Sequence, residues 1–133
     1  MPTATILSKI KERFPGAVLD ITEFADEHIL HVQGQDILLV LTELKDDGFN
    51  FLADLTAIDN LNLGGFERFA VSYHLLSHKT TERLTVKAYI PEEKPSLPSV
   101  ESLWKTADWQ EREVFDLYGI KFEGHPNLIR IMN

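Results

Sequence analysis

The spacing of apolar positions predicts two helices in the first half of the chain. Apolar side chains between residues 4 and 14 recur three to four positions apart and stop at Pro15-Gly16, which predicts an amphipathic helix. Residues 35–47 contain the run ILLVL, which fits a buried strand as well as a helix. Leucines three positions apart, followed by Gly48 where a helix C-cap would lie, favour the helix.

Strand-like alternation dominates the middle of the chain. It is clearest in LTVKAYI, where apolar residues alternate with Thr85, Lys87 and Tyr89. A short connection joins this run to the strand before it, so the two should form an antiparallel hairpin. The predicted strands cover residues 18–24, 28–32, 49–58, 67–76 and 81–90, with a loop at 60–65 and a proline-rich connector at 91–98.

These elements predict an α+β fold of two layers, in which a mixed or antiparallel sheet carries helices on one side. A C-terminal helix and an extended tail complete the prediction. We divide the chain into an α+β globular part, residues 1–97, and a C-terminal segment, residues 98–133, packed as part of the same single domain. A length of 133 residues suits one ordinary domain.

The C-terminal segment combines helix caps with charged residues and tryptophans. Ser99 can cap a short helix at the start of the segment. Asp108 can cap a second helix, with Glu111 three positions later as in a capping box. Gly119 should end that second helix, after which residues 120–131 run extended.

A helical wheel of the second helix separates two sides. One side holds Val114, Phe115, Leu117 and Tyr118, and the other holds Trp109, Arg112, Glu113 and Asp116. Arg112 and Asp116 are four positions apart and can form an ion pair. A solvated amphipathic helix with one such surface pair fits this periodicity. Trp109 on the charged side favours a docking surface instead, because Trp and Arg are enriched where protein partners bind.

Composition narrows the function classes. A net charge of −8 argues against nucleic acid, which binds basic surfaces. The chain has no cysteine, which excludes a disulfide, a thiol nucleophile, a zinc–thiolate site and a cysteine-ligated iron–sulfur cluster on these residues. The longest apolar run, residues 37–41, is far shorter than the roughly 20 residues of a membrane span. If the protein works at a membrane, another subunit should place it there.

Candidate catalytic chemistry is sparse. His74 and His78 are four apart, but they fall in and after a predicted strand rather than on one helix face. Glu113 and Asp116 are the two carboxylates that could face one substrate, so a stand-alone carboxylate hydrolase is the alternative from another class. We predict no catalytic, cofactor-binding or metal-binding residue on this chain.

A long ordered motif runs through the C-terminal segment. Its elements are Pro98-Ser99-Val100, Trp104, Ala107-x-Trp109, Glu111-Arg112-Glu113, Phe115-Asp116, Gly119-Ile120, Phe122, Gly124-His125-Pro126 and Leu128-x-Arg130. Weaker matches lie in residues 52–59 and 68–77. Together these motifs resemble the C subunit of the respiratory NADH:quinone oxidoreductase (complex I), a module that also occurs in related membrane-bound hydrogenases.

The resemblance implies a non-catalytic structural and assembly subunit in the peripheral arm of a proton-translocating enzyme, on the cytoplasmic face of the cell membrane. Such a subunit packs against the quinone-site subunit and the iron–sulfur subunits, and it is part of an enzyme only through them. NADH, flavin, iron–sulfur clusters and quinone are then held by partner subunits. The equivalent subunit of a membrane-bound hydrogenase or of another complex I-like dehydrogenase is the alternative.

The predicted partner-binding residues all lie in the C-terminal motif. They are Trp109, Glu111, Arg112, Glu113, Asp116, His125 and Arg130. The charged members should make charge-assisted contacts to the quinone-site subunit, and Trp109 and His125 should fix the geometry of these contacts.

Overall fold

The computed structural model describes residues 2–59 and 67–125. The elements in chain order are α1 (Thr3–Arg13), β1 (Val18–Phe24), β2 (Glu27–Gln33), the 3-10 turn η1 (Gly34–Asp36), α2 (Ile37–Asp46), β3 (Phe51–Asp59), β4 (Phe69–Leu76), β5 (Arg83–Ile90), β6 (Ser96–Pro98), α3 (Ala107–Tyr118) and β7 (Lys121–Glu123). The predicted loop at 60–65 lies outside the described residues.

The larger sheet has five strands in the order β1-β2-β5-β4-β3. Three of its pairings are antiparallel, and β2 runs parallel to β5, so the sheet is mixed. The hairpin predicted from the alternation in LTVKAYI is present, with β4 paired to β5 from Phe69–Ile90 to Leu76–Arg83. A second, two-stranded sheet pairs β6 with β7 in parallel. The predicted α+β fold class is confirmed.

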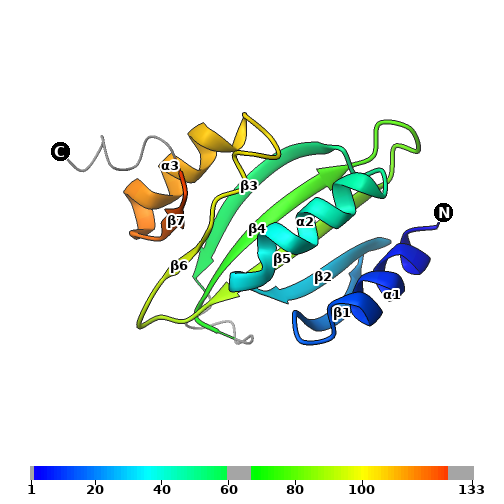
Figure 1. Ribbon diagram of the computed structural model, residues 1–133, viewed down its shortest axis with the longest axis horizontal. Coiled ribbons are helices and arrows are strands. Elements are labelled where there is room, and N and C mark those ends of the chain that lie inside the picture. Colours follow the sequence, from blue (N-terminus) through cyan, green and yellow to red (C-terminus); the bar gives the residue numbers. More distant parts are fainter. Residues whose placement is uncertain (1, 60–66, 126–133) are drawn as a thin grey trace.

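Helices α1 and α2 cover one face of the large sheet (Figure 1). The ILLVL run is helical, as the leucine spacing predicted, and α2 buries Ile37, Val40, Leu41 and Leu44. These side chains share one core cluster with the inward residues of β2, β4 and β5, such as Leu30, Tyr73 and Val86. Apolar burial on this scale is the main favourable term in folding.

The C-terminal segment differs from its prediction in two places. Residues 101–103 form only a turn, so the short helix expected after Ser99 is wrong. The connector instead contributes β6, a strand of three residues that gains its partner β7 from beyond α3. Short strands with no alternation of their own depend on such distant pairing, which local periodicity does not reveal.

The start of α3 also needs correction. The helix begins at Ala107, and its N-cap residue is Thr106, whose side chain makes no capping hydrogen bond. Asp108 therefore lies inside the first turn and is not the cap. Gly119 ends α3 as predicted, with a φ of 72° in the left-handed region that glycine adopts without steric cost.

Candidate partner-docking site

Helix α3 lies beside the edge strand β3, outside the two-helix layer (Figure 1). Two side-chain contacts hold it and its preceding turn there. The Gln110 amide donates to Asp54 Oδ1 of β3 at 3.2 Å, and the Trp104 indole N–H donates to the Asn50 carbonyl at 3.0 Å. Lys45 of α2 lies over the Trp104 ring, with its Nζ 5.5 Å from the ring centroid. Trp104 is thus an internal anchor, whereas Trp109 is not.

The buried stripe of α3 consists of Ala107, Glu111 and Val114. Glu111 is 0% exposed, and a carboxylate is almost never fully buried unless it is paired. Its Oε1 accepts a hydrogen bond from the Ser99 hydroxyl at 2.6 Å, and its Oε2 accepts one from the Val100 backbone N–H at 2.8 Å. The carboxyl group therefore fastens α3 to the chain that follows β6.

Burial sets the protonation of Glu111. Removal from water raises its pKa to about 7, against the opposing effects of the Ser99 and Val100 hydrogen bonds and the nearby His125. Burial also raises the pKa of Tyr73 well above its ordinary value, with the charge of Glu111 as the second cause. A buried acid that changes charge near neutral pH therefore lies at the junction of α3 and the sheet core.

His125 joins the end of β7 to the start of α3. Its ring Nε2 donates to the Asp108 backbone carbonyl at 2.9 Å and lies 3.0 Å from Asp108 Oδ1. Glu111 Oε1 is 3.9 Å from the same nitrogen. Because the His125 side chain is fully covered, its ring fixes the position of the chain that leaves β7.

The opposite face of α3 is exposed. Trp109, Arg112, Glu113 and Asp116 all lie on it, as the helical wheel predicted. Trp109 is 63% exposed, and the Arg112 guanidinium lies over its ring, 5.8 Å from the centroid. Arrangements of this kind are cation–π contacts.

Two expectations for α3 fail. Arg112 does not pair with Asp116 in the part of the chain that the structure describes, since its guanidinium leans over Trp109 instead. The predicted apolar side is only partly buried: Val114 is buried and Phe115 packs against the core, but Leu117 is 75% exposed and Tyr118 43% exposed. Glu111 is buried between Ala107 and Val114, so a carboxylate takes a place in the buried stripe where hydrophobicity alone selects an apolar side chain.

The predicted partner-binding residues thus occupy different positions. Trp109, Arg112, Glu113 and Asp116 share the exposed face, whereas Glu111 and His125 are inside the chain and could reach a partner only through the residues that cover them. Arg130 lies outside the described residues.

Sequence reasoning missed Ser99, Val100 and Asp108 as polar partners of the two buried residues, Glu111 and His125. No spacing rule links positions 99 and 111, because the contact depends on how β6 meets α3.

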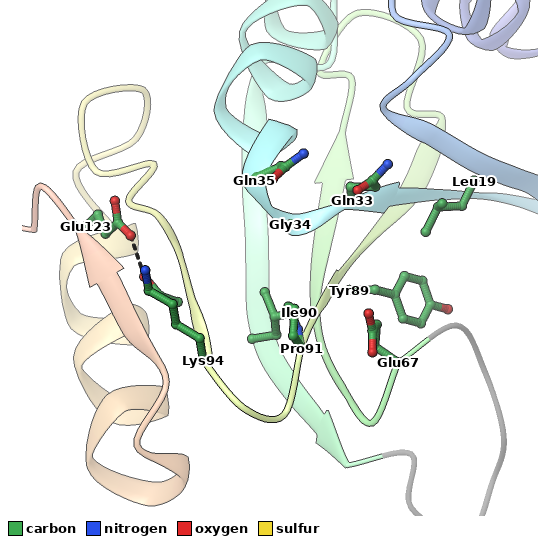
Figure 2. Close-up of a pocket in the computed structure, with 11 residues that line it drawn as sticks. Leu19, Gln33, Gly34, Gln35, Glu67, Tyr89, Ile90, Pro91, Lys94 and Glu123 are labelled. Atoms are coloured by element: carbon green, nitrogen blue, oxygen red, sulfur yellow. Dashed lines mark hydrogen bonds between the residues drawn. The ribbon is translucent and has the colours of Figure 1, made fainter.

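A separate cavity lies away from α3. A cavity of about 440 Å³ opens between η1, the end of β5 and the small sheet (Figure 2). Its polar lining comes from separate segments, including Gln33, Glu67 and Lys94. Gly34 forms part of its wall and packs closely on the end of β5, where a Cβ would lie 2.5 Å from the Ile90 Cγ2. Glu113 and Asp116 do not line this cavity, and they lie on an exposed helix face rather than in a cleft.

Metal and membrane features are also absent from the part of the chain described here. Residues 2–59 and 67–125 contain no group of three or more histidine or acidic side chains placed to hold a metal ion. None of the described helices has the length and apolar character needed to cross a bilayer.

Fold and site together define a class of protein: a two-layer α+β module with an added helix whose outer face is left open. Residues 30–133 match the family model described as the respiratory-chain NADH dehydrogenase 30 kDa subunit. The chain belongs to this family, the C subunits of the NADH-quinone oxidoreductases (complex I). The family expected from the C-terminal motif is therefore confirmed.

Individual relatives support the assignment. The chain is 48% identical to the NADH-quinone oxidoreductase C subunit from Citrifermentans bemidjiense, over 93% of this chain and 76% of that protein. It is 42% identical to the C subunit from Moorella thermoacetica, over 95% of this chain and 82% of the relative.

Solved structures agree with the fold. A trypsin-resistant fragment of Nqo5 superposes with a TM-score of 0.84 at 35% identity, covering 96% of this chain and all of the fragment. A chain of the membrane-bound sulfane sulfur reductase, an archaeal respiratory membrane complex, superposes with a TM-score of 0.77 at 26% identity, covering 93% of this chain and 72% of that chain.

Proposed function

We propose that this chain is a non-catalytic structural subunit in the peripheral arm of a proton-translocating NADH:quinone oxidoreductase, where it packs against the quinone-site subunit. Its membership of the C-subunit family supports a place in the complex. The outer face of α3 supports a docking role, because its side chains belong to the family motif and are exposed in the fold.

The observation that carries the proposal is the exposed Trp109. A tryptophan that is 63% exposed presents a large apolar area to water without contributing to the core. The Arg112 guanidinium lies over its ring, 5.8 Å from the centroid. Trp and Arg are the residue types that most often carry binding energy at protein interfaces. A partner that buried Trp109 and Arg112 would give these two side chains a binding role, whereas they have no role in the isolated fold.

Glu111 and His125 act from inside the chain in this proposal. The Glu111 carboxyl holds α3 against the chain after β6, and His125 holds the end of β7 against Asp108. Together they set the angle at which α3 presents its outer face. Arg130 remains a proposed partner contact on the resemblance alone.

Electron transfer belongs to the partners in this account. NADH, flavin, iron–sulfur clusters and quinone would be bound by the partner subunits of the arm, and the membrane would be reached through them. The absence of cysteine from the sequence supports this division, because iron–sulfur clusters are held chiefly by cysteine thiolates.

A second candidate is the equivalent subunit of another complex related to complex I. The observation that favours it is the TM-score of 0.77 to a chain of the archaeal membrane-bound sulfane sulfur reductase. The same module would then dock in a complex with a different electron donor.

Affinity purification of a tagged copy from native membranes tests the proposal, with the recovered partners identified by mass spectrometry. We expect the quinone-site and iron–sulfur subunits to be recovered, and the electron-input subunits among them will separate the two candidates. A tagged Trp109→Ala copy should recover markedly less of the complex. Recovery of the wild-type chain alone, while the membrane complex stays intact, contradicts the proposal.

A further inference from the structure

The outer face of α3 has a definite order of charges. The Arg112 guanidinium lies over the ring of Trp109, the third residue of the helix. Side chains on a helix lean toward its N-terminus, which accounts for this placement. Asp116 lies in the last turn, and Glu113 lies between the two on the same exposed face. Among these three side chains the positive charge lies nearer the N-terminal end of α3 and the negative charges lie toward its C-terminal end. Asp108, in the first turn, is acidic as well, but His125 contacts its carboxylate at 3.0 Å.

This order opposes the dipole of the helix itself. A helix favours anions near its N-terminus and cations near its C-terminus. Helix α1 follows that rule with Lys11 and Arg13 in its last turn, and α3 follows it at its first turn with Asp108. The order of Arg112 and Asp116 does not follow it. The last turn of α3 has no basic residue. The stability of α3 as a helix does not explain why its charges are arranged in this order.

Pairing within the chain does not explain the order either. Within residues 2–59 and 67–125, neither Arg112, Glu113 nor Asp116 forms an ion pair or a side-chain hydrogen bond. Charges elsewhere on the surface do pair, as in Lys9–Asp47, Arg13–Glu43 and Arg68–Asp59. The charges of the α3 face are thus available to another protein.

We propose that α3 binds a partner surface with the complementary order of charges. A carboxylate of the partner contacts Arg112 near the N-terminal end, and a cationic side chain contacts Glu113 and Asp116 toward the C-terminal end. This inference rests on the proposed function, because it requires that α3 docks. The Arg112 guanidinium lies over the Trp109 ring and makes no hydrogen bond within the described residues, so its N–H groups are available for a bidentate contact to a carboxylate.

The charge order also selects one direction of docking. A partner that approached in the reverse direction would bring its cationic group to Arg112 and its carboxylate to Asp116. Like charges brought together at an interface are strongly unfavourable and exclude wrong arrangements. The face of α3 therefore fixes the orientation of the subunit as well as its place.

An exchange of the two charges tests the proposal. The double variant Arg112→Asp with Asp116→Arg keeps the net charge and aligns the face with the helix dipole. The free chain should therefore unfold at the same temperature as wild type or at a higher one. We expect the complex recovered from native membranes by the tagged variant to fall about tenfold or more, because each charge now meets its like.

The matched control makes the same exchange on α1. Lys11→Asp with Glu12→Arg changes two exposed charges, both near the end of that helix, and should leave recovery at the wild-type level. Wild-type recovery by the α3 variant, or equal loss from both variants, overturns the proposal. Failure of the wild-type chain to recover the complex is a separate result, because it overturns the proposed function and this inference with it.

A crosslinking measurement stands independently of the folding of the double variant. An Arg112→Lys variant, assembled in the complex, places an amine where the guanidinium lies. Treatment with a carbodiimide should join that amine to a partner carboxylate, and mass spectrometry of the peptides will identify it. An intact complex in which position 112 forms no crosslink to a partner carboxylate overturns the inference while leaving the proposed function in place.

Discussion

At the residue scale, three successive positions of the family motif have different tasks. Glu111 is buried and accepts hydrogen bonds from Ser99 and Val100, whereas Arg112 and Glu113 face outward. Successive helical side chains point about 100° apart, so one dense charged run necessarily serves both the inside and the outside of the protein. Residue type alone does not say which of two glutamates is internal.

The raised pKa of Glu111 predicts a pH dependence of stability. Its pKa is about 7 in the folded chain and near 4.5 when unfolded, so the folded state holds this proton more tightly. The resulting stabilisation is complete below pH 4.5 and is lost as the pH rises through 7, by about 3 kcal/mol at most. Urea unfolding between pH 5 and 8 should show this fall in wild type and a flatter profile in Glu111→Gln.

Comparison of slopes is the control for Glu111. Other titrating groups are shared by the two proteins, so their contributions cancel in the difference between the profiles. A donor left unsatisfied in the Gln variant lowers its whole stability profile by a constant amount, which does not affect the comparison of slopes. Parallel profiles for the two proteins would show that Glu111 does not hold its proton in the fold.

At the element scale, α3 has one face packed into the fold and one exposed face, for which we propose docking. The buried stripe of Ala107, Glu111 and Val114 packs inward, and the outer face carries Trp109 and Arg112. Substitutions on the two faces should therefore separate stability from assembly.

Two single variants make that separation measurable. Val114→Ala creates a cavity in the core and should lower the free energy of unfolding of the free chain by about 1–3 kcal/mol. Arg112→Ala should change it by less than about 0.5 kcal/mol, yet lower recovery of the complex. Thermal unfolding and affinity purification of the same two variants check both values. A large loss of stability in Arg112→Ala would place that side chain in the fold and not at an interface.

Elements with a clear periodicity of hydrophobic residues were predictable from the sequence. The leucine spacing of α2 and the alternation in β5 each appear within ten residues of chain, and both elements are present. The β1–β2 turn was also expected, although Ala25 and Asp26 adopt positive φ there without glycine.

Contacts between distant segments could not be predicted in this way. Strand β6 forms because β7 lies beside it, and Glu111 is buried because Ser99 supplies a donor from another element. The outer face of α3 was predictable because exposure follows directly from helical geometry. Its buried face was predictable only in part, because Val114 is buried as expected but the carboxylate of Glu111 occupies another place on that face.

At the scale of the whole molecule, the sheet is protected against adding further strands. Both edge strands carry an irregularity at an aspartate, Asp20 in β1 and Asp54 in β3. Each carboxylate accepts a hydrogen bond from the next backbone N–H, that of Ile21 or Leu55, at 2.8 Å. Bulges and charges of this kind block edge pairing. Pairing of a partner strand with either edge is therefore disfavoured, which agrees with the proposed docking through side chains on α3.

The most direct test of the central claim is photocrosslinking within the native membrane complex. A photoreactive phenylalanine analogue placed at Trp109, on α3, should crosslink to the quinone-site subunit. The same analogue at Leu39, which is 58% exposed on α2, provides the comparison at an exposed apolar position on another helix. Crosslinks to that subunit from position 109 are the predicted result. An assembled complex with no crosslink from position 109 would show that α3 does not dock the subunit.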